Sequence, residues 1–398
     1  MTRSPSPASA RSALHDALAH HVTSGGVPGL VAVVAQRGAA EVAVIGAMAT
    51  DGPPLPRDAL FRISSMSKPV TAVAAMIAIE DGVLAPDAPI ERWLPELASR
   101  RVLRRLDGPL DDTVPARRPI TVRDLLTFTM GMGIVLSPPG ATPIQRAIDE
   151  LALGQGMPQP AIPPAPDEWL RRLGTLPLMH QPGERWMYHT SCDVLGALIA
   201  RAAHRPLEDY LRERIFAPLG MVDTGFSVPP ARRDRLVTGY RADPATGRLA
   251  PIDPPDGQWS RPPAFPSGGA GLVSTADDFL AFAEMLRRGG SGGPRGSRVL
   301  SPEAVAAMTR DQLTPAQKAA STWVPGFFDR FGWGLGMAVV ASDESGSPGS
   351  YGWDGGLGTA WRTDPAADRV AILLTQRAWD APVPPPVCRD FWRAARAG

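Results

Sequence analysis

Ser65 and Lys68 lie three residues apart in the stretch SSMSK, and this pair has the clearest potential for chemistry in the sequence. A serine hydroxyl is a weak nucleophile until a neighbouring base takes its proton. A lysine can be that base where burial or a nearby charge favours its neutral amine. The pair opens the apolar run KPVTAVAAMIAIEDGVL, and Pro69 is compatible only with the first turn of a helix. Because residues i and i+3 share one face of a helix, the sequence predicts that the Lys68 amine reaches the Ser65 hydroxyl.

A Ser-x-x-Lys match is weak evidence on its own, because any serine and lysine at this spacing produce it. The alternative interpretation is a serine that caps the helix and a lysine that is solvated. The chain contains 41 Lys and Arg residues in total, but only Lys68 and Lys318 are lysines, so a chance match is unusual here. Backbone N–H groups at the same helix start would also stabilise a developing oxyanion, which favours the catalytic interpretation.

Strand-like segments lie at both ends of the chain, and helical segments fill its middle. The expected strands are GLVAVVAQRG and AEVAVIGAMA near the N-terminus, and RFGWGLGMAVV, GTAWRTDP and DRVAILLTQ near the C-terminus. Terminal helices are expected over residues 10–24 and in VCRDFWRAARA, and Thr121 followed by Asp124 predicts a capped helix start in the middle. The simplest packing is an α/β (α+β) fold: one antiparallel sheet flanked by the terminal helices, with an inserted α-helical subdomain.

The expected organisation is a single module over residues 8–398. Its α/β subdomain takes residues 8–60 and 262–398, and its α-rich subdomain takes residues 61–261. Residues 137–166 contain many prolines, and we expect them to form an ordered irregular segment or a flap rather than a linker.

Composition argues against several classes of function. The formal net charge is +1 and no basic cluster is present, so nothing favours nucleic-acid binding. The longest apolar runs are too short to span a bilayer, and the N-terminal residues lack the apolar stretch of a signal peptide. Two cysteines make no disulfide framework, and no group of His, Asp and Glu has metal-ligand spacing. We therefore expect a cytoplasmic protein without metal, cofactor, membrane partner or nucleic-acid partner, and its oligomeric state stays open.

Two further motifs follow the Ser65–Lys68 pair along the chain. Tyr188 stands just before a predicted helix in QPGERWMYHTSCDVLGALIA, and Trp353-Asp354-Gly355 leads into a strand in SYGWDGGLGTAWRTDP. With these motifs the chain resembles the serine β-lactamase and penicillin-recognising superfamily, most closely its class C-like branch, which includes the family VIII carboxylesterases. The resemblance runs from VPGLVAVVAQRG to VAILLTQ and includes PSGGAGLVSTADD, which resembles a family segment near the site.

The resemblance implies a role for each matched residue. Ser65 would be the acylated nucleophile, Lys68 its partner, and Tyr188 the residue that shuttles the proton. The backbone N–H groups of Ser65 and Gly356 would form the oxyanion hole. Such a site acts through an acyl-enzyme and needs no cofactor.

Several positions depart from the family pattern. Thr190 stands where the Tyr-x-Asn motif has asparagine, and a hydroxyl can form a hydrogen bond but cannot reproduce an amide. Trp353 replaces the lysine that helps hold a substrate carboxylate in β-lactamases, and it offers an apolar wall instead. Asp354 would repel an anion if it pointed inward, and His189, beside Tyr188, is a candidate to line the site. The departures at Trp353 and Asp354 favour a small neutral ester over an anionic β-lactam.

The sequence therefore predicts a serine hydrolase that cleaves small neutral carboxylic esters, with a small-molecule ester or amide as its partner. Three alternatives stay open: the same chemistry on an amide or D-amino-acid peptide, or as acyl transfer to an alcohol; residual β-lactamase activity; and a sensor that is acylated once without turnover. The loop GGSGG at residues 289–293 also matches Gly-x-Ser-x-Gly, but that motif needs a preceding strand. The loop follows a predicted helix, so we interpret it as a flexible connection.

Overall fold

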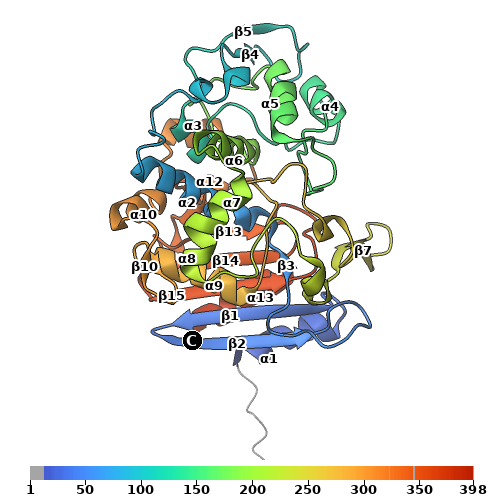
Figure 1. Ribbon diagram of the computed structural model, residues 1–398. Coiled ribbons are helices and arrows are strands. Elements are labelled where there is room, and N and C mark those ends of the chain that lie inside the picture. Colours follow the sequence, from blue (N-terminus) through green and yellow to red (C-terminus); the bar gives the residue numbers. More distant parts are fainter. Residues whose placement is uncertain (1–12, 322, 344–345, 398) are drawn as a thin grey trace, which may run out of the picture.

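A seven-stranded sheet forms the base of the molecule (Figure 1). The computed structural model describes residues 13–321, 323–343 and 346–397. The strand order is β11-β12-β13-β14-β15-β1-β2, and every neighbouring pair is antiparallel. The strands are β1 Gly29–Gln36, β2 Ala39–Gly46, β11 Phe331–Trp333, β12 Ala338–Val340, β13 Tyr351–Gly355, β14 Thr359–Asp364 and β15 Arg369–Thr375.

The two ends of the chain meet inside this sheet. Strand β1 pairs with β15, with Leu30 opposite Thr375, which confirms the antiparallel sheet built from both termini. The predicted strand RFGWGLGMAVV is divided, because a turn between β11 and β12 lets its two halves pair with each other.

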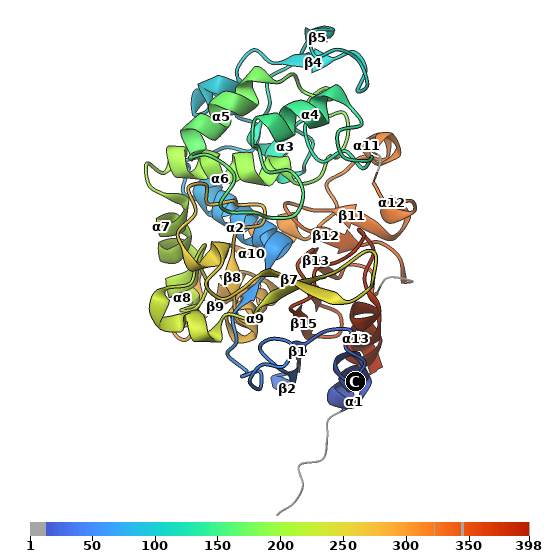
Figure 2. The same cartoon turned by 90° about the vertical axis from the view of Figure 1, so that its right-hand side faces the viewer.

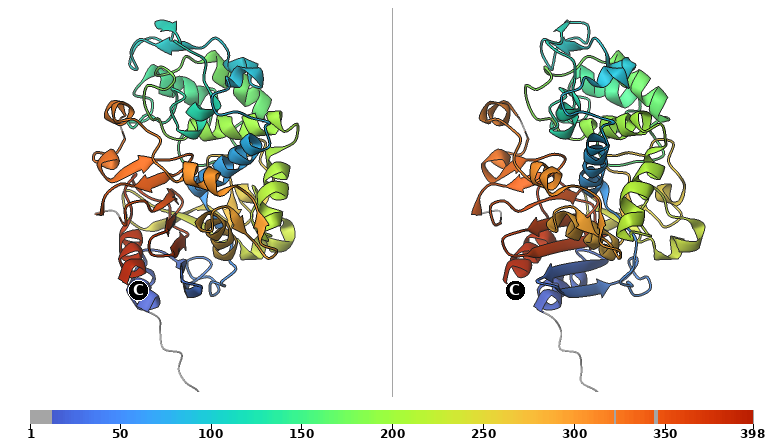
Figure 3. Two further views of the ribbon diagram at one scale, coloured as in Figure 1. Left: turned by 90° about the vertical axis from the view of Figure 1, so that its left-hand side faces the viewer. Right: turned by 60° about the vertical axis from the view of Figure 1, so that its left-hand side comes forward.

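Helices cover both faces of the sheet, and this explains the continuous apolar run of β1. Successive side chains of a strand point to opposite faces. Leu30 and Ala32 pack in the cluster of α1 (Ala13–Thr23) and α13 (Pro386–Ala397), while Val31 and Val33 belong to the main core with α2 (Ser67–Glu80) and α9 (Ala276–Arg287). Figures 2 and 3 show α1 and α13 side by side along one face of the sheet.

The helical region extends from beside the sheet to the end of the molecule farthest from α1 and α13 (Figure 1). Its helices are α3 Val122–Leu126, α4 Pro143–Glu150, α5 Pro166–Thr175, α6 Thr190–Ala202, α7 Leu207–Leu211 and α8 Ala217–Leu219. The predicted cap is confirmed at α3, where the Thr121 hydroxyl accepts the Asp124 N–H and the Asp124 carboxylate accepts the Thr121 N–H. Within the described residues no helix is long and apolar enough to cross a membrane.

The expectation of an irregular segment over residues 137–166 is wrong in part, because the segment contains α4. Thr142 and Gln145 form a capping box, Pro143 occupies the first turn, and Ile144 and Ile148 bury one face of the helix. The surrounding prolines obscured this local Thr-Pro-x-Gln signal.

Short elements complete the fold. The paired strands are β3 Phe61–Arg62 with β8 Val273–Ser274, β4 Arg101–Leu103 with β5 Thr113–Pro115, β6 Gly239–Ala242 with β7 Leu249–Asp253, and β9 Ser291–Gly292 with β10 Ser297–Arg298. The remaining helices are α10 Pro302–Met308, α11 Pro315–Ala320 and α12 Phe327–Arg330. Ser291 thus lies on a β-hairpin after α9 and not on a strand-to-helix turn.

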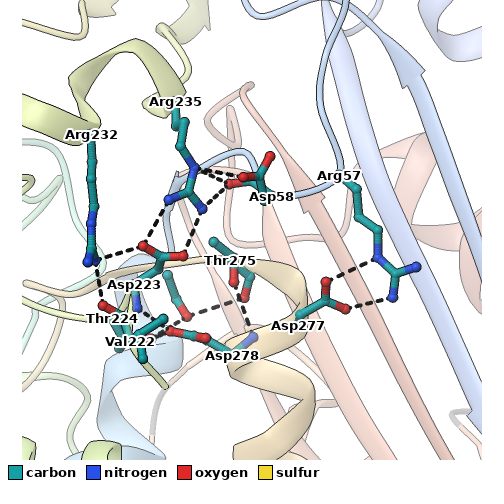
Figure 4. A network of polar contacts seen from close by, with 11 residues as sticks. Arg57, Asp58, Val222, Asp223, Thr224, Arg232, Arg235, Thr275, Asp277 and Asp278 are labelled. Carbon is teal, nitrogen blue, oxygen red and sulfur yellow. Dashed lines mark hydrogen bonds and ion pairs between the residues drawn. The ribbon is translucent and has the colours of Figure 1, made fainter. Parts of the chain in front are cut away.

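Polar networks anchor the segments around β3. Figure 4 shows Arg235 joining Asp58 to Asp223, while the Asp278 carboxylate accepts the Asp223 N–H. Burial raises the pKa of Asp278. Closer to β3, the buried guanidinium of Arg62 contacts the buried carboxylate of Asp253, with a Nε–Oδ2 distance of 2.7 Å.

Removing the Arg62 guanidinium is expected to destabilise the fold strongly. Arg62→Ala would leave Asp253 as a buried charge without its partner, a change that costs about 3–5 kcal/mol of unfolding free energy. Urea denaturation measures this loss. The control is Arg57→Ala, because the Arg57–Asp277 pair is exposed and pairs of that kind contribute about 1 kcal/mol or less. Equal losses in the two variants would contradict the prediction.

Candidate active site

Ser65 is held on a tight turn between a strand and a helix. It is the middle residue of the 3₁₀ turn Ser64–Met66, which connects β3 to α2, and N–H groups at such a helix start lack intrahelical partners. Ser64 has a positive φ of 47°, which is costly for a residue other than glycine. The Ser67 hydroxyl stabilises the turn, because it donates to the Ser64 carbonyl at 2.7 Å and accepts the Leu272 N–H at 3.1 Å.

Strand β13 lies directly against this turn. A Cβ added to Gly355 would overlap with the Ile63 carbonyl oxygen, so only glycine permits the approach. The Thr359 hydroxyl donates to the same carbonyl at 3.0 Å. The motif of Trp353, Asp354 and Gly355 is therefore placed beside Ser65, and Gly356 lines the cavity next to it.

Gly355→Ala is expected to lower activity by roughly a hundredfold, because an ångström-scale displacement of a reacting group has about that effect. The added methyl group must push β13 away from the turn that carries Ser65. Turnover of an aryl ester and the melting temperature measure the change. The structural control is Gly356→Ala, where the added Cβ meets no atom within 4 Å, so its melting temperature should stay at the wild-type value. A Gly355→Ala variant with normal turnover would show that the close approach is unimportant.

Lys68 is completely buried and lies within hydrogen-bond distance of Ser65. Its Nζ is 3.0 Å from Ser65 Oγ, donates to the Gly269 carbonyl at 2.7 Å, and lies 3.2 Å from His189 Nδ1. Within the described residues, no carboxylate forms an ion pair with this amine, whereas Lys318 pairs with Asp311. The structure therefore places one of the two lysines where it can exchange a proton with a serine.

Tyr188 lies beside Lys68 within a cluster of aromatic side chains. The Lys68 Nζ is 4.5 Å from the centroid of the Tyr188 ring. The Tyr188 hydroxyl accepts a hydrogen bond of 2.8 Å from the Trp353 indole, and the Trp323 ring packs at 4.9 Å. Trp353 therefore orients Tyr188 and also forms part of the cavity wall.

Thr190 and His189 follow Tyr188 in the sequence, and their side chains have different partners that the sequence did not predict. The Thr190 hydroxyl accepts a hydrogen bond of 2.6 Å from the Gln155 side chain. His189, which the sequence indicates only as a candidate to line the site, also contacts the Lys68 amine. The four-residue spacing between His189 and Asp193 is a local signal for the contact between these two residues, but it does not predict the contact of His189 with Lys68.

Asp193 holds His189 from the far side of the ring. The His189 Nε2 lies 3.1 Å from Asp193 Oδ2, and both side chains are buried. Asp193 Oδ1 accepts hydrogen bonds from the Ser267 hydroxyl at 2.6 Å and the Gly269 N–H at 3.0 Å. The segment PSGGAGLVSTADD thus supplies two partners of this network, as its resemblance to a family segment near the site predicted.

Asp354 does not present a free charge to the cavity. Its carboxylate forms two hydrogen bonds with Arg362, of 2.9 and 3.0 Å, and Arg362 also donates to the Trp361 carbonyl. Neighbouring strand residues point to opposite faces, so Asp354 and Trp353 leave β13 in opposite directions. Arg362 is consequently engaged and is poorly placed to hold a substrate carboxylate beside Trp353.

A cavity of about 820 Å³ opens at Ser65 and continues toward α13. At the Ser65 end, the cavity is lined by four aromatic side chains, those of Tyr188, Trp323, Phe327 and Trp353. A site of this volume holds a small organic substrate.

One group of side chains within the described residues could hold a metal ion. His20, His21 and Asp390 come together where α1 meets α13, with ligand atoms within 4.8 Å of one another. No sequence spacing indicates this group, because Asp390 is 369 residues from His21. His20 and His21 belong to α1 and Asp390 to α13, so the group lies on the face of the sheet opposite α2.

Comparison with known families shows to which family the chain belongs. The family model described as Beta-lactamase matches residues 14–386. The chain belongs to the beta-lactamase family. Protein Rv1367c of Mycobacterium tuberculosis is 44% identical over 340 residues, which is 83% of this chain and 81% of that protein. Esterase EstB of Burkholderia gladioli is 34% identical over 348 residues, 83% of this chain and 80% of EstB.

Comparison with solved structures supports the same fold. The structure of EstCE1, described as a hydrolase with promiscuous acyltransferase activity, has a TM-score of 0.80 and 27% sequence identity. The match covers 96% of this chain and 97% of EstCE1. The chain is thus a serine hydrolase or acyltransferase with the beta-lactamase fold, as the sequence motifs predicted.

Proposed function

We propose that this protein cleaves small neutral carboxylic esters through an acyl-enzyme on Ser65. The observation that carries the proposal is the buried Lys68 amine, 3.0 Å from the Ser65 hydroxyl at the aromatic end of a large cavity. Lys68 takes the Ser65 proton while Oγ attacks the ester carbonyl, and the N–H groups of Ser65 and Gly356 stabilise the oxyanion. Tyr188 passes a proton to the leaving alcohol, and water then releases the acid. These steps need no cofactor.

The preference for neutral esters rests on the surroundings of Trp353. An indole occupies the position where β-lactamases present a cation, and the nearby Arg362 is paired with Asp354. Loss of a charge-assisted hydrogen bond to a substrate anion weakens binding by about 1.5–3 kcal/mol, or roughly one to two powers of ten. Apolar walls instead favour an uncharged acyl chain. The similarity to EstB, which is named as an esterase, supports the same class of substrate.

Acyl transfer to an alcohol is the second candidate function. The cavity extends well beyond Ser65, which leaves room for an acceptor beside the acyl-enzyme, and EstCE1 is described as having promiscuous acyltransferase activity. Product analysis with an added primary alcohol separates the two: a transferase yields the new ester at the expense of the free acid. Amides and D-amino-acid peptides, assayed alongside, test the remaining hydrolase alternatives.

A substrate panel tests the charge preference. We expect p-nitrophenyl esters from acetate to about hexanoate to be hydrolysed well, with a gain of about 0.8 kcal/mol for each methylene buried until the pocket is full. Anionic cephalosporins should be cleaved poorly or not at all. Values of kcat/KM and mass spectrometry of the intact protein measure turnover and the acyl adduct. Faster turnover of a cephalosporin than of every neutral ester would refute the ester assignment, and a single burst without steady state would indicate a sensor.

Variants of Trp353 separate its hydrogen bond to Tyr188 from its contact with the acyl chain. Trp353→Phe keeps an aromatic wall but removes the hydrogen bond to Tyr188, so kcat should fall by a similar factor for all esters. Trp353→Ala also removes the wall, so it should lose more on hexanoate than on acetate. Steady-state kinetics on both esters measure the difference. Identical chain-length profiles in wild type and Trp353→Ala would mean that the indole does not contact the acyl group.

A further inference from the structure

Among the described residues, three polar groups lie within hydrogen-bond distance of the Lys68 amine, and their hydrogen-bonding properties limit how it can act as a base. Its Nζ is within 3.2 Å of Ser65 Oγ, the Gly269 carbonyl and His189 Nδ1. A neutral amine offers two N–H groups and one lone pair. The Gly269 carbonyl can only accept, so it takes one N–H. The second N–H and the lone pair remain for the serine and the imidazole, and only one arrangement directs the lone pair at the serine.

The tautomer of His189 selects that arrangement. An ionised carboxylate only accepts hydrogen bonds, so a hydrogen on His189 Nε2 satisfies the contact of 3.1 Å with Asp193. Nδ1 of the neutral ring is then an acceptor directed at Lys68. Burial, and next the charge of Lys68, hold the pKa of His189 below its ordinary value, which favours the neutral ring. Although burial opposes ionisation, the His189 ring and the hydrogen bonds from Ser267 and Gly269 hold the pKa of Asp193 below its usual range.

The backbone conformation of His189 indicates that the surrounding structure holds this residue in place. Its φ of 85° and ψ of −68° are unusual for a residue other than glycine. Conformations of this kind persist where the surrounding structure enforces them, and they concentrate at functional sites. Gly269 closes the network, because its carbonyl accepts from Lys68 and its N–H donates to Asp193.

We propose that His189 and Asp193 form a positioning pair for Lys68: Asp193 sets the imidazole tautomer, and His189 Nδ1 accepts the second N–H of the amine, so that its lone pair faces the Ser65 hydroxyl. This inference rests on the proposed acylation of Ser65. In that step the Ser65 O–H bond breaks and its proton joins the Lys68 lone pair to give an ammonium group. The Oγ electron pair forms the bond to the carbonyl carbon, and the carbonyl π pair moves to its oxygen. His189 and Asp193 keep their protonation states throughout.

Asp193→Asn tests the pair with almost no change of shape. The amide oxygen can replace Oδ1 and keep the hydrogen bonds from Ser267 and Gly269, while the amide NH₂ replaces Oδ2 opposite His189 Nε2. An NH₂ group donates, so the imidazole hydrogen moves to Nδ1 and competes for the Lys68 lone pair. We expect labelling of Ser65 by a fluorophosphonate probe to slow by roughly a hundredfold, the lower range for proton-transfer effects. The melting temperature should stay close to that of the wild type.

A spectroscopic measurement separates tautomer control from a merely structural role. In protein labelled with ¹⁵N-histidine, the wild-type His189 signals should show the hydrogen on Nε2, and those of Asp193→Asn should show it on Nδ1. His189→Gln assigns the signals by their disappearance. The matched control is Asp390→Asn, which changes another His–Asp contact, between His21 Nε2 and Asp390 Oδ2 at 2.9 Å. Its labelling rate should equal that of the wild type.

The outcomes distinguish this inference from the proposed function. If Asp193→Asn is labelled within about threefold of the wild-type rate, the positioning role is overturned while the acylation of Ser65 stands. A hydrogen on His189 Nδ1 in the wild-type protein would also overturn the positioning role. If the wild type is not labelled at Ser65, the proposed function fails and the positioning role fails with it.

Discussion

Ser65→Ala is expected to abolish turnover of every ester and to remove the acyl adduct from the mass spectrum of the intact protein. Loss of a covalent nucleophile removes the whole route, so the effect is several powers of ten and not a few-fold factor. The fold should be unaffected, because the contacts that hold the turn come from the side chains of Ser67 and Thr359.

Ser291→Ala is the matched control, since Ser291 occupies the competing Gly-x-Ser-x-Gly sequence. It lies on the β9–β10 hairpin, where no strand-to-helix turn would expose it as a nucleophile. Its kinetics should equal those of the wild type. An inactive Ser291→Ala variant together with an active Ser65→Ala variant would reverse the assignment of the nucleophile.

Lys68→Arg is expected to be almost as inactive as Lys68→Ala. A guanidinium keeps the positive charge but stays protonated in proteins, so it cannot take the Ser65 proton. Acylation rates from single-turnover experiments measure the loss. Lys318→Arg is the control, because this lysine forms an ion pair with Asp311 that arginine can reproduce. More than a tenth of the wild-type rate in Lys68→Arg would exclude lysine as the base.

Tyr188→Phe should slow catalysis by roughly a hundred- to ten-thousand-fold, the usual range for general acid–base help. The phenylalanine ring keeps the aromatic contact with Lys68 but leaves the Trp353 indole without its acceptor. Rates with p-nitrophenyl and alkyl esters give a second readout: the loss should be larger for alkyl esters, whose leaving alcohol needs a proton more. Equal losses for both esters would argue against proton delivery by Tyr188.

The sequence by itself determined the features that depend on local spacing. The helical repeat places Lys68 one turn from Ser65 whatever the rest of the chain does, and the distance of 3.0 Å agrees with that expectation. The apolar strands at the two termini predicted their pairing, because continuous burial on both faces requires neighbouring strands and covering helices. Thr121 and Asp124 likewise marked the start of α3 from four consecutive residues.

Only the tertiary structure decided the contacts between distant segments. His189 is 121 residues from Lys68, and Gly269 is 201 residues from it, so no spacing rule could join them. Thr190 was the position under question in the sequence, yet the turn of the backbone at His189 directs the imidazole to Lys68 and the Thr190 hydroxyl to Gln155. The sequence also could not show whether the Asp354 carboxylate has a partner. That depends on the pairing of β13 with β14, which brings Arg362 to Asp354. The physical reason is the same in each case: backbone geometry fixes neighbours within a helical turn or along a strand, whereas packing of the whole core fixes which segments meet.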